Sequence, residues 1–396
     1  MREVYLISAV RTPLGRFGGK LLDFSAVELG AHVMGSAMAQ ARIPQEALDI
    51  YIMGNVLRAG QGQLLPRQAA FKAGIPETVN GYALDMVCSS GMMSLINAIN
   101  HIRVGDAELV LAGGMESMSQ AGFFLSHRAR WGYKFLLKEP EQLTDILLCD
   151  GLIDATTKES MGEQAERLAK EHGFSRSELD EVALYSQQRA TAATERGSYR
   201  NEIAPIEIKT KKGSQIVDQD EGIRADTTLE GLSKLQPAFK QEGVLTAGNC
   251  SQLSDGAAAV ILASSSAVER YGLQPIVKVL GVAWEGGETW RFPEYPVYAA
   301  KKLLNKMQMK LSDFDLFENN EAFAISNLLF SKILGVAHDK LNVNGGSIAL
   351  GHPIGSSGTR IVVTLLHALI EYEKTRGLAA ICHGTGGGTA LAFERV

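Results

Sequence analysis

Cysteine is scarce in this chain of 396 residues, which contains only Cys88, Cys149, Cys250 and Cys382. No two of them form a Cys-x-x-Cys pair, and none has partners at the spacing of a metal site. His383 beside Cys382 is an adjacent pair without distant ligands, which makes a poor metal site. The pattern argues against a zinc site and a disulfide framework, so we expect a reducing compartment and no metal.

Long apolar runs and concentrated charge are also missing. The N-terminal apolar run stops at Arg11, too short for a membrane span, and no signal-peptide cleavage pattern follows it. The C-terminal Phe-Glu-Arg-Val is not a peroxisomal address. The net charge is −5 with no basic run, and the chain is 45% hydrophobic and 21% charged, as in ordinary globular proteins. We therefore expect a cytoplasmic protein that binds neither membrane nor nucleic acid.

Two glycine-rich nucleotide motifs are absent as well. No Gly-x-Gly-x-x-Gly follows the first predicted strand, and no Gly-x-x-x-x-Gly-Lys-[Ser/Thr] occurs anywhere. These absences argue against a dinucleotide fold and a P-loop. We interpret the glycines from Gly384 to Gly388 as an array of backbone N–H donors instead.

A helix with a cysteine at its start is the clearest candidate for chemistry. Met92, Ile96 and Ile99 recur at helical spacing after Ser89 and Ser90, which predicts a helix that begins there. Cys88 would lie at the positive end of its dipole, among unpaired N–H groups that lower the pKa of a thiol. A thiolate there could act as a nucleophile. The alternative is a small, buried and inert thiol.

The order of elements in the first part of the chain recurs from about residue 275. Each part is predicted as strand, helix, strand, helix, strand, and the last strand of each enters what we predict to be a glycine turn, at Gly113–Gly114 and after Cys382. Asp49-Ile-Tyr matches Asp315-Leu-Phe, and Ser89-Ser-Gly matches Ser356-Ser-Gly, at nearly one offset. The sequence therefore predicts a duplicated α/β fold in which two helix N-termini converge.

The residues between the two halves have a different composition, richer in charge and glutamine. We predict an N-terminal half (1–121 plus 247–271), an inserted loop domain (122–246) that covers one face of the core, and a C-terminal half (272–396). Ser175-Arg-Ser-Glu178 is a capping box that predicts a helix ending at Gly197. The aromatic and basic stretch Phe123–Phe135 is a candidate lid, and Lys209–Gly213 is predicted to be a charged turn.

Three further side chains lie at the predicted ends of elements. His352 follows Gly351 and precedes a proline, Cys382 ends a strand, and Asn320 follows the strand that begins at Asp315. Each has a structural alternative: a hydrogen-bonded histidine, a buried thiol and a helix N-cap. Together with Cys88 they are placed as the parts of a site between two halves would be.

The motifs that contain these residues resemble the signature blocks of the thiolase family, in family order and over essentially the whole chain. The matching blocks are Val87-Cys-Ser-Ser-Gly-Met92, Gly113-Gly-Met-Glu-Ser-Met-Ser119, Asn320-Glu-Ala-Phe323, Gly351-His-Pro-Ile-Gly355 and the Cys-x-Gly turn at Cys382. The resemblance is nearest to the acetoacetyl-CoA branch. It implies a five-layer αβαβα fold of two duplicated halves, with a loop domain that carries much of the coenzyme A site.

The resemblance also implies catalytic roles. Cys88 would be the acylated nucleophile, and His352 would take its proton and stabilise a first oxyanion with a water held by Asn320. Cys382 would remove the α-proton of the second acetyl-CoA. The backbone N–H groups of Cys88 and Gly384 would form the second oxyanion hole. Because thioester enolates are unstable, such a base and preorganised donors must share the work.

For coenzyme A, family positions carry over onto this chain, with Arg224 near the adenine and ribose end and the others along the pantetheine: Leu152, Met161, Arg224, Ser251 and Phe323. No bound cofactor is implied, since coenzyme A thioesters are substrates. Three positions depart from the family pattern. Ser160 replaces the usual histidine of the acyl pocket, Asn319 precedes the Asn-Glu-Ala-Phe block, and His383 with Thr385 alters the last turn.

The predicted function is a thiolase that condenses two acetyl-CoA molecules reversibly through an acyl-Cys88 intermediate, as a homodimer or homotetramer. One alternative is a degradative 3-ketoacyl-CoA thiolase for longer chains, which kinetics over chain length would separate. A non-catalytic, lipid-binding or scaffold relative would commonly lack the Asn-Glu-Ala-Phe block. A ketoacyl synthase would have a second histidine in place of Cys382 or Asn320.

Overall fold

Two sheet halves of matching strand order form the centre of the molecule. The computed structural model describes residues 2–132, 137, 141–211 and 213–396. The first half consists, in sheet order, of β4 (Asn80–Leu84), β3 (Ile50–Gly54), β5 (Leu109–Ser117), β10 (Ser254–Ser264) and β1 (Val4–Arg11), with β2 (Gly15–Arg16) beside β10. The second half continues with β11 (Val277–Gly286), β14 (Gly387–Arg395), β13 (Arg376–His383) and β12 (Leu316–Asn319).

The strand directions confirm the predicted duplication. β3 and β5 are parallel while β5, β10 and β1 are successively antiparallel, and β12, β13, β14 and β11 repeat that sequence of directions. The counterpart of β4 is a single parallel bridge between Phe317 and Leu341. The halves join where β1 pairs with β11 over two residue pairs, Tyr5 with Lys278 and Leu6 with Val277.

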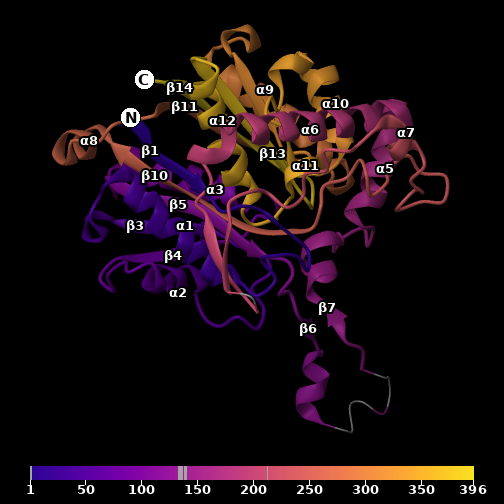
Figure 1. Cartoon of the computed structure of the whole chain (residues 1–396), viewed down its shortest axis with the longest axis horizontal. Helices are drawn as coiled ribbons and strands as arrows, with labels where there is room; N and C mark the ends of the chain where they lie inside the picture. The colour runs from indigo at the N-terminus through magenta and orange to yellow at the C-terminus, as the bar shows by residue number, and fades with distance from the viewer. Residues whose placement is uncertain (1, 133–136, 138–140, 212) are drawn as a thin grey trace.

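Helices cover both halves and fill the space between them (Figure 1). Helices α3 (Ser90–Val104) and α12 (Ser357–Glu371) lie side by side in the central layer. Helices α1 (Ala26–Ala41) and α2 (Leu65–Lys72) cover the outer face of the first half, and α9 (Tyr295–Met307) with α10 (Ala324–Leu329) cover that of the second. The result is the predicted five-layer arrangement.

Local sequence signals explain these helices. Ser25 and Glu28 form a reciprocal capping box at the start of α1. Met92, Ile96 and Ile99 on α3 are fully buried in the core between the two sheets. That helix begins where predicted, at Ser90 after N-cap Ser89.

The residues between β5 and β10 form the inserted segment. Its elements are β6 (Phe123–Phe124), β7 (Thr144–Asp145), a π-helical turn (Leu147–Leu152), α5 (Met161–His172), α6 (Arg176–Arg196), β8 (Ile206–Thr210), β9 (Gly213–Val217) and α7 (Leu229–Ser233). The capping box of Ser175 and Glu178 opens α6, and Gly197 ends it in a left-handed conformation, as predicted. Helix α6 packs against α10 and α11 (Ser347–Leu350). After β10 comes α8 (Ser265–Tyr271).

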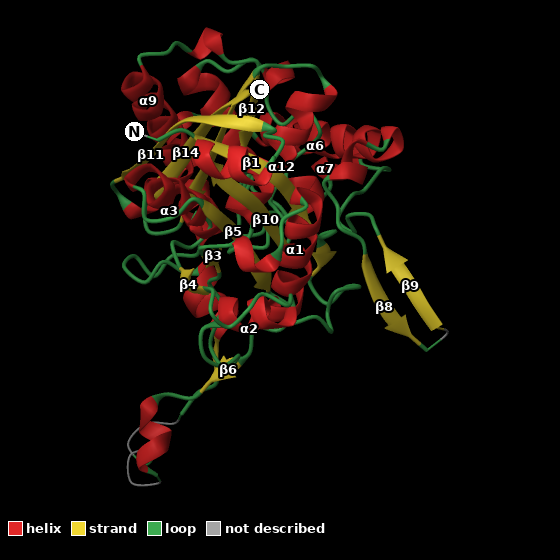
Figure 2. Cartoon of the chain, turned by 90° about the vertical axis from the view of Figure 1, so that its left-hand side faces the viewer, coloured by secondary structure: helices red, strands yellow, loops and turns green. Residues whose placement is uncertain are grey.

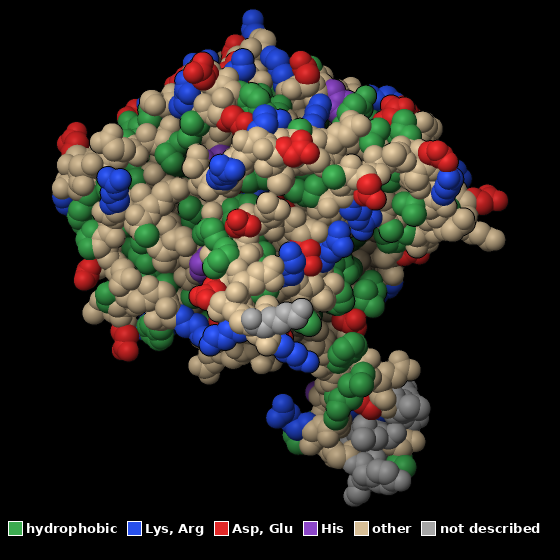
Figure 3. Space-filling model, viewed as in Figure 1, with side chains coloured by type: hydrophobic (Ala, Val, Ile, Leu, Met, Phe, Trp, Pro, Cys, Tyr) green, Lys and Arg blue, Asp and Glu red, His purple; other side chains and the backbone are tan. Residues whose placement is uncertain are grey.

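The predicted lid is wrong for its described residues. Strand β6, which consists of Phe123 and Phe124, lies on an arm that projects away from the body (Figures 1 and 2), and neither these residues nor Trp131 line the apolar cavity described below. Apolar side chains gather where the arm leaves the body (Figure 3). Residues 133–135 of the predicted stretch lie outside the described residues.

Two predicted turns are also corrected. Gly113 and Gly114 do not turn the chain but lie inside β5. Position 114 needs glycine because a Cβ there would stand 2.2 Å from the carbonyl oxygen of Gly355. Their role is close approach of strand and loop. In the predicted turn Lys209–Gly213, Lys209 lies within β8 and Gly213 is the first residue of β9. Only the two residues between Thr210 and Gly213 connect the strands of this hairpin, and one of them, Lys212, lies outside the described residues.

The described part of the chain contains no helix with both the length and the hydrophobicity needed to cross a membrane. The domain boundaries predicted above stay a prediction.

Candidate active site

Cys88 lies in a tight turn between β4 and α3. The turn is fixed by Ser90, whose hydroxyl accepts a hydrogen bond from the N–H of Met86 (2.8 Å) and donates one to the carbonyl of Val87 (2.6 Å). Val87 has a φ of 49°, which is uncommon for a β-branched residue and marks a strained backbone. The turn thus holds the thiol in one place, and the side chain is only 8% exposed.

The electrostatics of Cys88 differ from the prediction. Burial raises the pKa of its thiol to about 12, although hydrogen bonds from the backbone N–H groups of Gly384 and of Cys88 itself lower it. The expectation of a lowered pKa is therefore wrong, because loss of hydration outweighs the helix start. The same two N–H groups are the donors predicted for the second oxyanion hole, and they do lie at the sulfur.

Cys382 is the neighbour of Cys88 across the two halves. It sits near the end of β13 and is fully buried, and the hydroxyl of Ser89 donates to its carbonyl oxygen (3.3 Å). Burial raises the pKa of the Cys382 thiol well above its usual value, and negative charge on Cys88 raises it further. A thiolate at Cys88 therefore opposes ionisation of Cys382, and both thiols are protonated at rest.

His352 is held as a neutral imidazole with one ring nitrogen free. Its Nδ1 lies 2.6 Å from the hydroxyl of Ser357, and that hydroxyl donates its only proton to the carbonyl of Pro353 (2.9 Å). Nδ1 must therefore carry the hydrogen, which leaves Nε2 as an acceptor. Burial, followed by the cation of Arg360, lowers the pKa of His352 to about 3. The imidazole is thus neutral, and its Nε2 carries an unprotonated lone pair.

Asn320 follows β12 and faces that free nitrogen. Its Nδ2 lies 3.4 Å from Nε2 of His352, and its Oδ1 accepts a hydrogen bond from the hydroxyl of Ser347 (2.7 Å). The N–H of Asn320 donates to the carbonyl of Ala380 on β13 (3.1 Å). Asn320 is fully buried, and its amide presents a donor to the same space as His352. It does not serve as a helix N-cap, since Phe323 has that position in α10.

An apolar cavity of about 510 Å³ opens in front of His352. All five residues predicted to contact coenzyme A line it, as does Ser160: Leu152, Ser160, Met161, Arg224, Ser251 and Phe323. Of the predicted catalytic residues only His352 lines it directly. Gly384 lies behind Met161, because a Cβ on Gly384 would stand 3.1 Å from the Met161 sulfur. The structure thus groups the predicted site residues as a reactive centre behind an apolar chamber.

The structure adds residues that the sequence reasoning missed. Met118, Phe239, Gln252, Leu253 and Ile354 also line the cavity. Met118 and Ile354 lie inside two of the blocks quoted above, although no role was assigned to them, whereas Phe239, Gln252 and Leu253 are loop residues that no spacing pattern marked. Ser160 reaches the cavity edge as the N-cap of α5, where it forms a capping box with Glu163.

Glu116 is a further residue to which the sequence analysis assigned no role, and it is fully buried beside the nucleophile. It accepts hydrogen bonds from the backbone N–H groups of Val56 (3.0 Å) and Gly355 (2.9 Å) and from the amide of Asn55 (2.8 Å). Burial raises its pKa to about 7 and these backbone N–H groups oppose that shift. Its signal was available, since glutamate in an otherwise apolar strand needs donors.

Among the described residues, no group of three or more His, Cys, Asp or Glu side chains could hold a metal ion. All four cysteines are unpaired. The site offers thiols, an imidazole, an amide and backbone N–H groups, which suits proton transfer and acyl transfer to sulfur.

Comparisons with known proteins agree with this chemistry. Family models described as the N-terminal and C-terminal domains of thiolase match residues 4–266 and 273–395. A curated acetyl-CoA acetyltransferase of Synechocystis sp. is 67% identical over 396 residues, covering 100% of both chains. Human mitochondrial 3-ketoacyl-CoA thiolase superposes with a TM-score of 0.96 at 40% identity, covering 100% of this chain and 99% of that one. A thiolase of Ascaris suum in complex with coenzyme A superposes with a TM-score of 0.93 at 38% identity, covering 100% of both chains.

Proposed function

The chain belongs to the thiolase family, and within it we propose that the protein is an acetyl-CoA acetyltransferase. It condenses two acetyl-CoA molecules to acetoacetyl-CoA and coenzyme A, and it catalyses the reverse thiolysis. The observation that carries this proposal is the 67% identity, over both full lengths, to a relative named for that activity. The grouping of Cys88, Cys382, His352 and Asn320 behind an apolar chamber supports it.

In the first half-reaction, the Cys88 sulfur attacks the acetyl thioester. Because the resting thiol is protonated, its proton moves to Nε2 of His352 as the carbon–sulfur bond forms, and then to the departing coenzyme A thiolate. The negative charge on the attacked oxygen is stabilised by His352 and by donors at Asn320. The product is an acetyl group on Cys88 at thioester energy, so the step is reversible.

In the second half-reaction, Cys382 loses its own proton to solvent and then, as a thiolate, takes the α-proton of another acetyl-CoA; it regains a solvent proton at the end of the cycle. The carbanion attacks the acetyl carbonyl on Cys88, whose oxygen accepts hydrogen bonds from the N–H groups of Cys88 and Gly384. The Cys88 thiolate then leaves and regains a proton from Cys382. Negative charge on Cys88 raises the pKa of Cys382, so acetylation of Cys88, which removes that charge, favours the Cys382 thiolate that this step needs.

Longer 3-ketoacyl-CoA thioesters are a second candidate substrate class, which the residue at position 160 favours. Ser160 lies at the cavity edge, where the family resemblance implies a histidine ring, and most of the side chains that line the cavity are apolar. Longer 3-ketoacyl-CoA thioesters therefore have room. Turnover measured with acetoacetyl-CoA and with longer homologues separates the two, and a specificity constant that rises with chain length would overturn the acetyl preference.

The direct test is incubation with acetoacetyl-CoA, followed by intact-mass analysis with and without added coenzyme A. We expect one acetyl-sized adduct on Cys88 that coenzyme A discharges as acetyl-CoA. No adduct and no turnover with any 3-ketoacyl-CoA would contradict the enzyme proposal and favour the scaffold alternative.

We further propose that the enzyme acts in the cytoplasm as a homodimer or homotetramer without a resident cofactor. Four unpaired cysteines, two of them at the reactive centre, support a reducing compartment. Sedimentation of the purified protein tests the assembly.

A further inference from the structure

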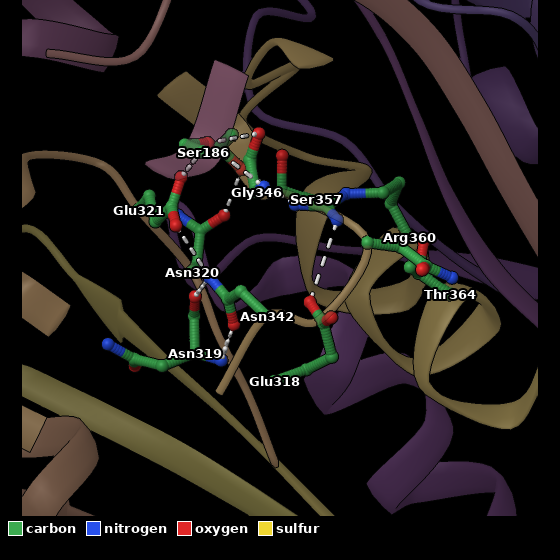
Figure 4. A network of polar contacts seen from close by, with 12 residues as sticks. Ser186, Glu318, Asn319, Asn320, Glu321, Asn342, Gly346, Ser357, Arg360 and Thr364 are labelled. Atoms are coloured by element: carbon green, nitrogen blue, oxygen red, sulfur yellow. Dashed lines mark hydrogen bonds and ion pairs between the residues drawn. The ribbon is translucent and has the colours of Figure 1, made fainter. Parts of the chain in front are cut away.

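Arg360 is a fully buried cation with few contacts. It lies on α12 and its Nη2 donates a hydrogen bond to the hydroxyl of Ser347 (2.7 Å). Its Nη1 forms a long ion pair with Glu318 (3.8 Å), shown as a dashed line in Figure 4. Within the described part of the chain, Nε and Nη1 have no hydrogen-bond partner.

Such an arrangement is poor for stability. A buried guanidinium normally forms several short hydrogen bonds, because loss of its hydration is costly. Here the carboxylate oxygens of Glu318 also lack hydrogen-bond partners among the described residues. Among the described residues, Arg360 makes one short hydrogen bond, to Ser347, and this contact therefore indicates its role.

Ser347 connects the cation to the catalytic amide. Its hydroxyl has one proton, which it donates to Oδ1 of Asn320 (2.7 Å), while its oxygen accepts from Arg360. This direction of bonding leaves only Nδ2 of Asn320 to face His352. If the amide turned over, Oδ1 would face the free Nε2 and two acceptors would oppose each other.

We propose that Arg360 is a positioning residue that acts through Ser347 to hold the Asn320 amide with its N–H toward His352. The inference rests on the proposed function, because the orientation of the amide affects catalysis only if His352 and Asn320 act in the thiolase reaction. It concerns neither the nucleophile nor the base. Arg360 fixes which end of the amide meets the imidazole.

Ser347→Ala tests the link with the smallest change. We expect kcat of condensation to fall about 2- to 13-fold, which corresponds to one hydrogen bond of about 0.5–1.5 kcal/mol, with KM within about twofold of the native value. Ser356→Ala is the matched control, because Ser356 is also fully buried beside α12 but its hydroxyl has no partner among the described residues. Equal kcat values for the two variants would overturn the proposal.

Arg360→Lys tests whether the cation acts through the serine. We expect its loss in kcat and that of Ser347→Ala to be non-additive, so that the double variant resembles the more impaired single variant. Additive losses would show that Arg360 acts by another route. Thermal unfolding of each variant identifies any that fails to fold, and Ser347→Ala then decides alone.

A measurement without substrate separates this proposal from the proposed function. Nitrogen-15 NMR of imidazole-labelled protein reports which ring nitrogen of His352 carries the hydrogen, and the signal is assigned by its loss in His352→Gln. We expect an unprotonated Nε2 in the native protein and in Ser356→Ala, and a second population or exchange broadening in Ser347→Ala. An unchanged His352 signal in Ser347→Ala would overturn the positioning role, whether or not the protein turns over acetyl-CoA.

Discussion

Replacing Asn320 by aspartate should change both the donor and the charge that face His352. The substitution keeps the shape of the side chain and the contact to Ser347, but it puts a carboxylate oxygen where Nδ2 now lies, 3.4 Å from Nε2. His352 is neutral in the native protein because burial and Arg360 lower its pKa to about 3. A carboxylate at that distance stabilises the imidazolium instead.

The size of the effect follows from the distance. At an effective dielectric constant of about 20, two unit charges 3.4 Å apart attract with about 5 kcal/mol. Since one pKa unit corresponds to about 1.4 kcal/mol, this raises the pKa of His352 from about 3 to between about 6 and 7. His352 would then be protonated in mildly acidic solution and unable to accept the Cys88 proton.

The assay measures kcat for thiolysis of acetoacetyl-CoA from about pH 5.5 to about pH 8.5, which is roughly the range in which histidine side chains titrate in proteins. In Asn320→Asp we expect a low rate with a new acid limb, so that kcat rises with pH through about 6 to 7. Asn320→Ala is the control: it loses the donor, with a fall of about 10²–10³ in kcat, but adds no charge and no limb. An identical pH profile in the two variants would refute the assignment of a neutral, proton-accepting His352.

Other predictions follow from the same geometry. Cys88→Ala should abolish turnover with an unchanged melting curve, because a small buried side chain is replaced conservatively; turnover near the native rate would remove Cys88 from its role. Cys382→Ser should still give acetylated Cys88 by intact mass but condense slowly, and equal loss of both steps would argue against a separate base. Ser160→His should shift chain-length preference toward acetoacetyl-CoA and, because the serine caps α5, lower the free energy of unfolding by about 1 kcal/mol in chemical denaturation. The lowered pKa of His352 means that the unfolded chain binds the extra proton, so the free energy of unfolding of the native protein, measured relative to that of His352→Gln, should fall by about 1.4 kcal/mol per pH unit from about pH 6.5 down to about pH 3. The difference between the two proteins removes the opposite contribution of Glu116, whose pKa is raised to about 7.

Periodic and capping signals predicted the elements well because they are local. The spacing of Met92, Ile96 and Ile99 is a property of one helix, and the box of Ser175 and Glu178 involves four consecutive residues. The duplicated order was also visible, since the matched turns at Ser89 and Ser356 begin equivalent helices. These signals need no knowledge of what packs against them.

Predictions that depended on distant neighbours were less successful. The glycines at Gly113 and Gly114 look like a turn in the sequence, and only the carbonyl of Gly355, far along the chain, shows why a strand needs them. The pKa of Cys88 depends on how completely the second half covers it, which no local pattern reveals. The relay from Arg360 through Ser347 likewise joins separate segments.

The pseudo-symmetry also explains why the two equivalent turns have different chemistry. Cys88 and Gly355 occupy matching positions before α3 and α12, yet a Cβ on Gly355 would stand 2.5 Å from a carboxylate oxygen of Glu116. That carboxylate receives the N–H of Gly355 and so fixes the loop that follows His352. A side chain is thus excluded from one turn, where the contact to Glu116 anchors the loop of His352, and the other turn is left to present the nucleophile. The asymmetry between the two halves, rather than the duplication itself, is what makes the interface between them a reactive centre.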